Sequence, residues 1–508
     1  MRRREFLKSA AIAPVGANFL FPVRRSDRPN LLFVWTDQQR PDTLAVYGNS
    51  RIQAPNLNKL ASESIVFERA YVSQPVCTPS RSTVLTGLWP HQNGCTENNL
   101  PLAENIPCLP EILADPEYRT GYFGKWHLGD ELFAQRGFEE WESIEDIYQQ
   151  YFRPGRDRSR RSSYHHFLVE RGYKPNEPDG TFGRLYAAKL PIEHCKPKFL
   201  EMKACDFLRR RRSEPFILHV NFLEPHPPYY GPLNGEYRAE DMELEPNYTD
   251  PLEEDEPLNY RLKRDRARTA RPEGMDLRTD DGWRRLKANY WGSVTHVDRS
   301  VGAILKTLED LGLADRTIVV FTSDHGEMLG AHGMLAKSVM YEEAVRIPWL
   351  MRVPALGRRH RLIRGRFSHI DLIPTVLDLM GRPMPGRFPG RSLLPEISWG
   401  SPKPANVFIQ WNATLKYVEG DLLKPEFQSE TIQRAVRTNT RTVISPDGWK
   451  LCLSDADKNQ LFDLNRDPYE TKNIFYTGQH RDVIRRLTSE IHEWQRSIKD
   501  RVAVAEAG

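Results

Sequence analysis

The chain has 508 residues, of which 39% are apolar and 28% are charged. This composition is typical of a globular protein, and the length allows more than one domain and a large core. The net charge is +4, from 72 basic and 68 acidic residues. This nearly equal number of positive and negative charges argues against binding to nucleic acid or to an anionic membrane.

Residues 1–26 are interpreted as an export signal rather than as part of the fold. Arg3 and Arg4 are followed by Glu-Phe-Leu-Lys, an order that resembles the bacterial twin-arginine export signal. The weakly apolar stretch at residues 9–21 is too short to span a membrane, and no later segment is long and apolar enough. We therefore expect a periplasmic or secreted bacterial protein without a membrane span.

Apolar runs predict a parallel sheet. Residues 31–35, 215–222 and 317–322 are short apolar runs of the kind found in buried strands, and 120–129 predicts a further strand and loop. Helical spacing appears at 55–63, at 109–114 and over the long amphipathic stretch 283–311. Strands that alternate with helices predict an α/β domain at 27–380, with a large, mostly parallel central sheet flanked by helices.

Two polar segments interrupt this pattern. Residues 146–190 are expected to form a loop-dominated insertion, and 240–281 either a long substrate-facing loop or a partly disordered segment. Beyond residue 381, strand-like runs at 407–411, 435–438, 442–445 and 449–453 precede a final helix at about 481–498. We therefore expect a small C-terminal α+β subdomain at 381–508 with a short antiparallel sheet.

Cys77 opens the pentapeptide Cys-Thr-Pro-Ser-Arg, and residues 80–85 can continue it as a helix. Proline is favoured in a first helical turn, so Cys77 is placed at a helix N-terminus, where free N–H groups favour an anion. Arg81, one turn later, can reach back and pair with a charged oxygen. The six cysteines contain no Cys-x-x-Cys pattern, so neither a zinc ribbon nor a disulfide is required.

Acidic residues follow two of the predicted strands. Asp37 and Gln38 come after the first strand, and Asp324 and His325 after the third. Ligands of open α/β sheets lie at the carboxyl ends of the strands, so these side chains are expected to converge. Carboxylate-rich clusters bind hard divalent cations, and a histidine shifts the preference towards manganese.

The order of these motifs resembles that of the type I sulfatases. Besides the Cys-x-Pro-x-Arg signature, the chain carries Gly-Lys-Trp-His-Leu-Gly at 124–129, Pro225-His226, Ser-Asp-His-Gly at 323–326 and Lys337 in the family's order. The similarity covers most of residues 29–475. It implies an alkaline-phosphatase-like fold and a sulfuric ester hydrolase in which a maturation enzyme oxidises Cys77 to formylglycine, the hydrate of which is the nucleophile.

The resemblance also implies roles for single residues. Asp37, Gln38, Asp324 and His325 would hold a divalent metal together with the hydrated residue 77. Calcium is the first expectation, with manganese and magnesium as alternatives, because many sulfatases have a second aspartate where this chain has Gln38.

Arg81, Lys125 and Lys337 would position the sulfate and the nucleophile, while His127 and His226 would move protons. His219, which lies within a predicted strand, is interpreted as a buried core histidine.

The expected substrate is a sulfated sugar or oligosaccharide, with specificity in the segments 146–190 and 228–282. A phosphonate monoester or phosphodiester hydrolase of the same superfamily is the main alternative, and the Lys125-to-His127 run favours sulfate. A catalytically silent carbohydrate-binding relative and a structural exported protein are less favoured, because the catalytic set is complete. The sequence does not indicate an oligomeric state.

Overall fold

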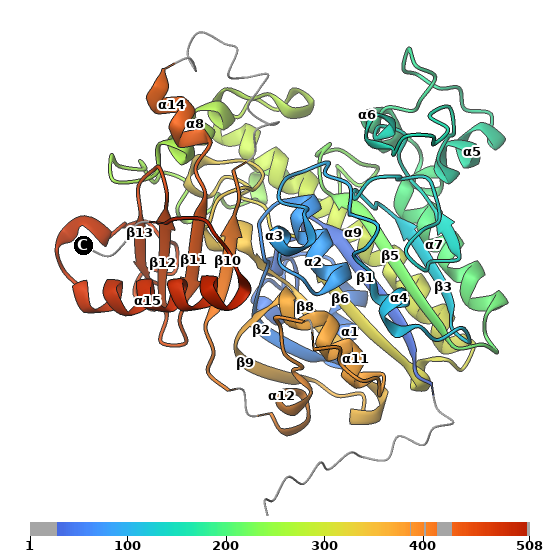
Figure 1. The fold of residues 1–508 in the computed structure, drawn as a ribbon. Coiled ribbons are helices and arrows are strands. Elements are labelled where there is room, and N and C mark those ends of the chain that lie inside the picture. The colour runs from blue at the N-terminus through green and yellow to red at the C-terminus, as the bar shows by residue number, and fades with distance from the viewer. Residues whose placement is uncertain (1–27, 387, 401–402, 414–428, 505–508) are drawn as a thin grey trace, which may run out of the picture.

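The computed structural model describes residues 28–386, 388–400, 403–413 and 429–504. The expected export signal at residues 1–26 lies outside this range. Within it, the chain forms a nine-stranded sheet and a separate four-stranded sheet (Figure 1). Among the helices of the described ranges, none has the length and apolar character needed to cross a membrane.

The large sheet is mostly parallel, as predicted. Its order is β4-β3-β5-β1-β6-β8-β2-β7, with β9 paired to β2. The run from β4 to β6 is parallel throughout, whereas β8 is antiparallel to both of its neighbours. The strands are β1 (Asn30–Asp37), β2 (Ile65–Tyr71), β3 (Arg119–Gly124), β4 (Glu140–Glu142), β5 (Phe216–Pro225), β6 (Thr317–Ser323), β7 (Arg346–Ile347), β8 (Trp349–Arg352) and β9 (Arg361–Ser368).

Helices cover both faces of this sheet. Alternate residues of β1 point to opposite sides, so Phe33 packs in one core and Val34 in another. The first core contains residues of α2 (Cys77–Thr86) and α11 (Leu372–Leu379). The second contains residues of α1 (Pro55–Ser62), α7 (Lys196–Arg210) and α9 (Asp280–Asp310). Because both faces are covered, every residue of β1 is buried, which explains its continuous apolar run.

The small sheet is antiparallel and follows chain order, from β10 (Val407–Trp411) through β11 (Thr440–Ile444) and β12 (Trp449–Ser454) to β13 (Gln460–Asp463). Helix α15 (Arg481–Ile498) packs across one of its faces (Figure 1). The expected short antiparallel sheet and final helix are therefore confirmed. The domain boundary near residue 380 stays a prediction.

Other sequence-based expectations differ from the structure. The strand expected at 435–438 is wrong, because α14 (Glu430–Val436) reaches into it and is capped by the hydroxyl of Ser429. Residues 240–281 contain α8 (Leu258–Thr269), which buries Tyr260 and Ala267 and leaves many of its charged side chains at least partly exposed.

The insertion at 146–190 is mostly loop, as expected, but includes α5 (Ser163–Glu170) and α6 (Arg184–Ala188). Strand β5 continues to Pro225, two residues past the predicted loop start. The remaining short helices are α3 (Pro90–Asn93), α4 (Leu109–Leu113), α10 (Glu342–Val345) and α12 (Leu394–Trp399).

Candidate active site

Two parallel strands, β1 and β6, end at the same edge of the large sheet, and helix α2 begins there. Asp37 is the last residue of β1, Asp324 and His325 follow β6, and Cys77 is the first residue of α2. One potential ligand atom from each of these four side chains lies within 4.8 Å of the others. The Sγ atom of Cys77 is 3.2 Å from Nε2 of His325 and 3.8 Å from Oδ1 of Asp37. The structure thus brings together the four residues that the strand ends place here.

Arg81 lies behind this cluster and holds its two carboxylates apart. Its Nη2 atom is 2.9 Å from Oδ2 of Asp37, and its Nε atom is 2.8 Å from Oδ2 of Asp324. Nη1 donates to the carbonyl of Lys125, and the guanidinium lies over the ring of Trp35. The side chain has no exposed surface. In this arrangement Arg81 positions the acidic side chains and one end of the loop that carries Lys125.

Lys125 places a positive charge beside Cys77. Its Nζ atom is 2.6 Å from Oδ2 of Asp37 and 3.8 Å from Sγ of Cys77. Burial disfavours the ammonium, but Asp37, Cys77 and Tyr148 together outweigh this and raise the pKa of Lys125. Burial and Asp37 also oppose ionisation of Cys77, yet Lys125, Lys337 and His325 together lower the pKa of its thiol. The environment of residue 77 therefore favours a negatively charged atom.

His127 is held in one orientation by two side chains. Its φ angle is +59°, and the carboxylate of Glu131 accepts hydrogen bonds from the backbone N–H groups of Trp126 (2.8 Å) and His127 (2.6 Å). The side-chain oxygen of Asn99 lies 2.7 Å from Nε2 of His127 and accepts a hydrogen bond from it. The other nitrogen, Nδ1, is buried and has no hydrogen-bond partner among the described residues.

Burial, followed by the positive charges of Lys125 and Arg81, keeps the pKa of His127 well below its usual value. The ring is therefore neutral at neutral pH. With the proton on Nε2, the Nδ1 lone pair is free to accept another. This arrangement suits a general base.

Gly124 lets the chain turn from β3 into this loop. Its φ angle is +120°, and a Cβ atom at this position would lie 1.9 Å from the backbone oxygen of Asn221. We expect Gly124→Ala to lower both the melting temperature and kcat, because the neighbouring Lys125 must shift. Gly48→Ala is the matched control, since Gly48 has φ +107° but open space around its Cβ position. Equal losses in the two variants, measured by thermal unfolding and steady-state kinetics, would contradict this explanation.

Gln38 links the first strand to the loop that carries Lys337. Its side-chain oxygen accepts a hydrogen bond from Nζ of Lys337, and its Nε2 donates to Glu327 and to Tyr229. Glu327 also accepts from the backbone N–H groups at residues 329 and 336, at the two ends of that loop. Because the Gln38 oxygen is engaged by Lys337, its role as a metal ligand stays a prediction.

His226 lies one residue past β5. Its Nδ1 atom is 2.8 Å from the carbonyl oxygen of Pro227, which leaves Nε2 for exchange of a proton. Burial lowers the pKa of His226 well below its usual value; Asp37 opposes this, and Lys337, Lys125 and Arg184 add to it.

His219, by contrast, stacks on Phe33 with ring centroids 4.7 Å apart. It is fully buried, as expected of a core histidine, but neither ring nitrogen has the expected hydrogen-bond partner among the described residues.

The donor set fits a divalent cation. Two carboxylates, an imidazole and residue 77 converge from separate elements, and none is more than 1% exposed. Oxygen and imidazole ligands suit calcium, magnesium or manganese.

Several supporting residues were not predicted from the sequence. They act through hydrogen bonds from loops, which leave no periodic signal; they are Asn99, Glu131, Glu327, Tyr229 and Tyr148, the last with its ring centroid 4.6 Å from that of His127.

Family models match almost the whole described chain. Residues 29–382 match the Sulfatase model, and residues 330–497 match the model described as N-sulphoglucosamine sulphohydrolase, C-terminal. The fold and the site are those of a hydrolase of the alkaline-phosphatase-like superfamily. Since the first match covers more than half of the 508 residues, the chain belongs to the sulfatase family, and the protein is a sulfatase enzyme.

Individual relatives agree with this assignment. N-acetylglucosamine-6-O-sulfatase of Bacteroides thetaiotaomicron is 27% identical over 528 aligned residues, covering 93% of this chain and 87% of the relative. A protein solved in complex with its substrate D-glucosamine-2-N,6-O-disulfate has a TM-score of 0.72 at 23% identity, covering 93% of this chain and 98% of that one. Phosphonate monoester hydrolase of Agrobacterium radiobacter has a TM-score of 0.75 at 21% identity, covering 93% and 96%. At these sequence identities, the similarity to the two solved structures establishes the fold but not the function.

Proposed function

We propose that this sulfatase removes sulfate from a sulfated sugar or oligosaccharide, using a formylglycine made from Cys77 and a divalent metal. The convergence of Cys77 with Asp37, Asp324 and His325 beside Lys125 carries this proposal. The sugar-sulfatase relative and the substrate of the solved neighbour support a carbohydrate substrate.

The metal would be held by Asp37, Gln38, Asp324 and His325 together with residue 77, and calcium is proposed first, with manganese or magnesium as alternatives. A bound divalent cation would supply a Lewis acid at the sulfate oxygens. Formylglycine supplies a hydrated aldehyde, of which one hydroxyl attacks sulfur and the other allows the sulfate to leave.

The side chains then have separate tasks. Lys125 and Lys337 offset negative charge on the sulfate oxygens, aided by the positive end of the α2 dipole. His127 takes the proton of the second hydroxyl of the formylglycine hydrate through Nδ1, which has no hydrogen-bond partner among the described residues. His226, through Nε2 and together with Lys337, returns a proton to the departing alcohol. A sulfate group bound beside His226 adds negative charge, which favours the protonated ring that this step needs.

We further propose that the protein is exported to the periplasm or beyond by the twin-arginine route. A formylglycine-generating enzyme of the host is then the partner required for maturation of Cys77.

The second candidate is a phosphonate monoester or phosphodiester hydrolase. The sequence pairs Asp37-Gln38 and Asp324-His325, which resemble those of such hydrolases, and the similarity in fold to a phosphonate monoester hydrolase favour it. The presence of Lys125 and His127 beside residue 77 makes sulfate the first choice.

One substrate comparison tests both candidates. Protein produced together with a formylglycine-generating enzyme is assayed beside a Cys77→Ala control on an aryl sulfate, an aryl phosphonate monoester and a panel of sulfated oligosaccharides. We expect sulfate release to dominate and to vanish in the control. Dominant turnover of the phosphonate would instead establish the second candidate.

A further inference from the structure

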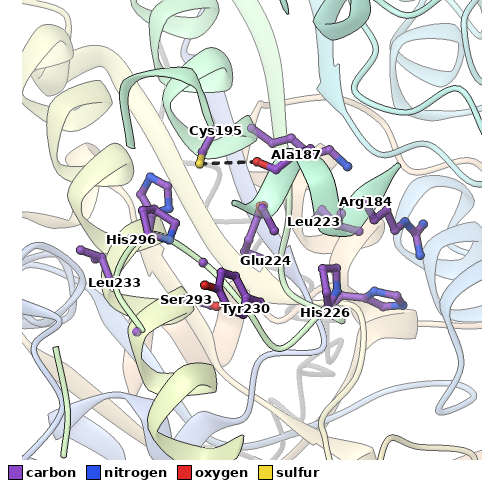
Figure 2. Close-up of a pocket in the computed structure, with 16 residues that line it drawn as sticks. Arg184, Ala187, Cys195, Leu223, Glu224, His226, Tyr230, Leu233, Ser293 and His296 are labelled. Carbon is purple, nitrogen blue, oxygen red and sulfur yellow. Dashed lines mark hydrogen bonds between the residues drawn. The ribbon is translucent and has the colours of Figure 1, made fainter. Parts of the chain in front are cut away.

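A cavity lies beside His226, with Arg184 and Ala187 also in its lining (Figure 2). It is lined by α6, by the start of α7, by the end of β5 and by α9. Its charged or titratable lining residues are Arg184, Lys196, Glu224, His226, Tyr230 and His296. Because His226 is the proposed donor to the departing alcohol and the enclosed space is only about 20 Å³, the cavity has room for a small substituent of the sugar rather than for the ring.

Arg184 belongs to the insertion at residues 146–190, for which a role in substrate specificity is expected. Its side chain is held in this cavity by two neighbouring side chains. Its Nε and Nη2 atoms each lie 2.6 Å from one carboxylate oxygen of Glu145, and Nη2 also donates to the hydroxyl of Tyr148 at 2.9 Å. The carboxylate is buried, whereas 23% of the Arg184 side chain remains exposed. This bidentate contact removes much of the conformational freedom that a ligand would otherwise have to restrict.

The surroundings of Arg184 carry an excess of positive charge. Lys196 binds the same carboxylate, with Nζ 2.9 Å from Oε1 of Glu145, so two cations share one anion. Glu224 does not fully cancel this excess, since burial raises its pKa to about 7 and keeps much of it protonated at neutral pH.

Two buried polar atoms in the cavity lining are also unused. Oε2 of Glu224 and Nε2 of His296 have no hydrogen-bond partner among the described residues. His296 is only 4% exposed. Buried polar atoms of this kind are normally satisfied, so a polar ligand is expected to bind them.

The geometry points to a second anion subsite: we propose that Arg184, with Lys196, binds a carboxylate or second sulfate on the sugar whose ester is cleaved. The inference rests on the proposed function and narrows its substrate to a sulfated sugar with a further anionic substituent. Arg184 is a binding residue here, since it lines the cavity beside His226 and keeps part of its side chain exposed.

Matched pairs of substrates test this subsite. D-glucosamine-2-N,6-O-disulfate is compared with D-glucosamine 6-O-sulfate, and a 6-O-sulfated disaccharide containing a uronate with its neutral-sugar counterpart. For each pair, the ratio of kcat/KM for the doubly anionic ester to that for the singly anionic ester is measured. In the unsubstituted protein we expect at least one ratio to exceed one, and the pair that shows it tells a second sulfate from a carboxylate.

Arg184→Gln is expected to lower that ratio by about tenfold or more, mainly through KM, because a charge-assisted contact is lost. Arg158→Gln, which alters an exposed arginine of the same insertion, is the control and should leave the ratio unchanged. A general folding defect would lower both kinetic constants of a pair together and leave their ratio intact. Ratios at or below one in the unsubstituted protein, or an unchanged ratio in Arg184→Gln, would overturn the inference.

The same comparison by calorimetry does not depend on turnover. In a Cys77→Ala background, the disulfate is expected to bind more tightly than the monosulfate, and Arg184→Gln should remove the difference. If no sulfate ester is hydrolysed but this difference is present, the proposed function fails while the subsite stands. If sulfate esters are hydrolysed but the difference is absent, the subsite alone is refuted.

Discussion

A Cys77→Ser variant is expected to react once and then stop, retaining one sulfuryl group on residue 77. The serine hydroxyl would occupy the same position at the start of α2, beside Lys125 and the acidic cluster, and can attack sulfur. Serine has no second hydroxyl from which His127 could remove a proton, so the sulfate cannot leave by the proposed route. Turnover of an aryl sulfate should fall by about a thousandfold or more, as for loss of a nucleophile in other hydrolases.

Intact-mass measurement after incubation with the aryl sulfate should show the mass of one added sulfuryl group, and a peptide map should place it on residue 77. Cys452→Ser is the control, because Cys452 is equally buried but lies in β12 of the small sheet. Its folded fraction should turn over normally and remain unlabelled. Sustained turnover by Cys77→Ser would refute the two-hydroxyl scheme.

Replacing Arg81 by Met is expected to make the fold depend on a divalent metal. The change removes the arginine that pairs with both buried carboxylates, so Asp324 keeps His325 nearby and Asp37 keeps Lys125 and His325. Breaking a buried ion pair by removing one partner costs about 3–5 kcal/mol. A divalent cation bound by Asp37, Asp324 and His325 restores positive charge at the same carboxylates, so it should recover much of this loss.

Thermal unfolding with chelator and with added calcium, manganese or magnesium measures the effect. The rise in melting temperature on adding metal should be larger for Arg81→Met than for the unsubstituted protein. Arg441→Met is the matched control, since Arg441 is also fully buried and paired with Asp500, but in the small sheet. Its loss of stability should not respond specifically to metal. An equal metal response in all three proteins would argue against a cation site at the cluster.

The parts of the fold that could be predicted are those with a strong apolar pattern. Strands β1, β5 and β6 are continuous apolar runs because both faces of the sheet are covered, and α9 shows clear helical spacing. The antiparallel strands β7 and β8 are two and four residues long, too short for any period to appear. Helix α8 was missed because so many of its residues are charged and few are buried.

The residues of the site also divide into those that could be predicted from the sequence and those that could not. Asp37 and Asp324 could be placed because a strand end is a defined position in the fold. The side chains that orient the catalytic groups, such as Glu131 under His127 and Glu327 beside Gln38, act across loops whose path depends on tertiary contacts. Arg184 lies in an insertion, where neither motif nor period predicts which side chain reaches the site.

The burial of α2 restricts when the proposed oxidation of Cys77 can take place. All ten residues from Cys77 to Thr86 are buried, including the Cys-x-Pro-x-Arg signature. A maturation enzyme that recognises this signature has no access to it once the chain has folded and the helix is buried. The proposed oxidation of residue 77 must therefore take place while the chain is still unfolded, which would decide the active fraction before folding. Maturation enzyme added to purified, folded protein comes too late to change that fraction.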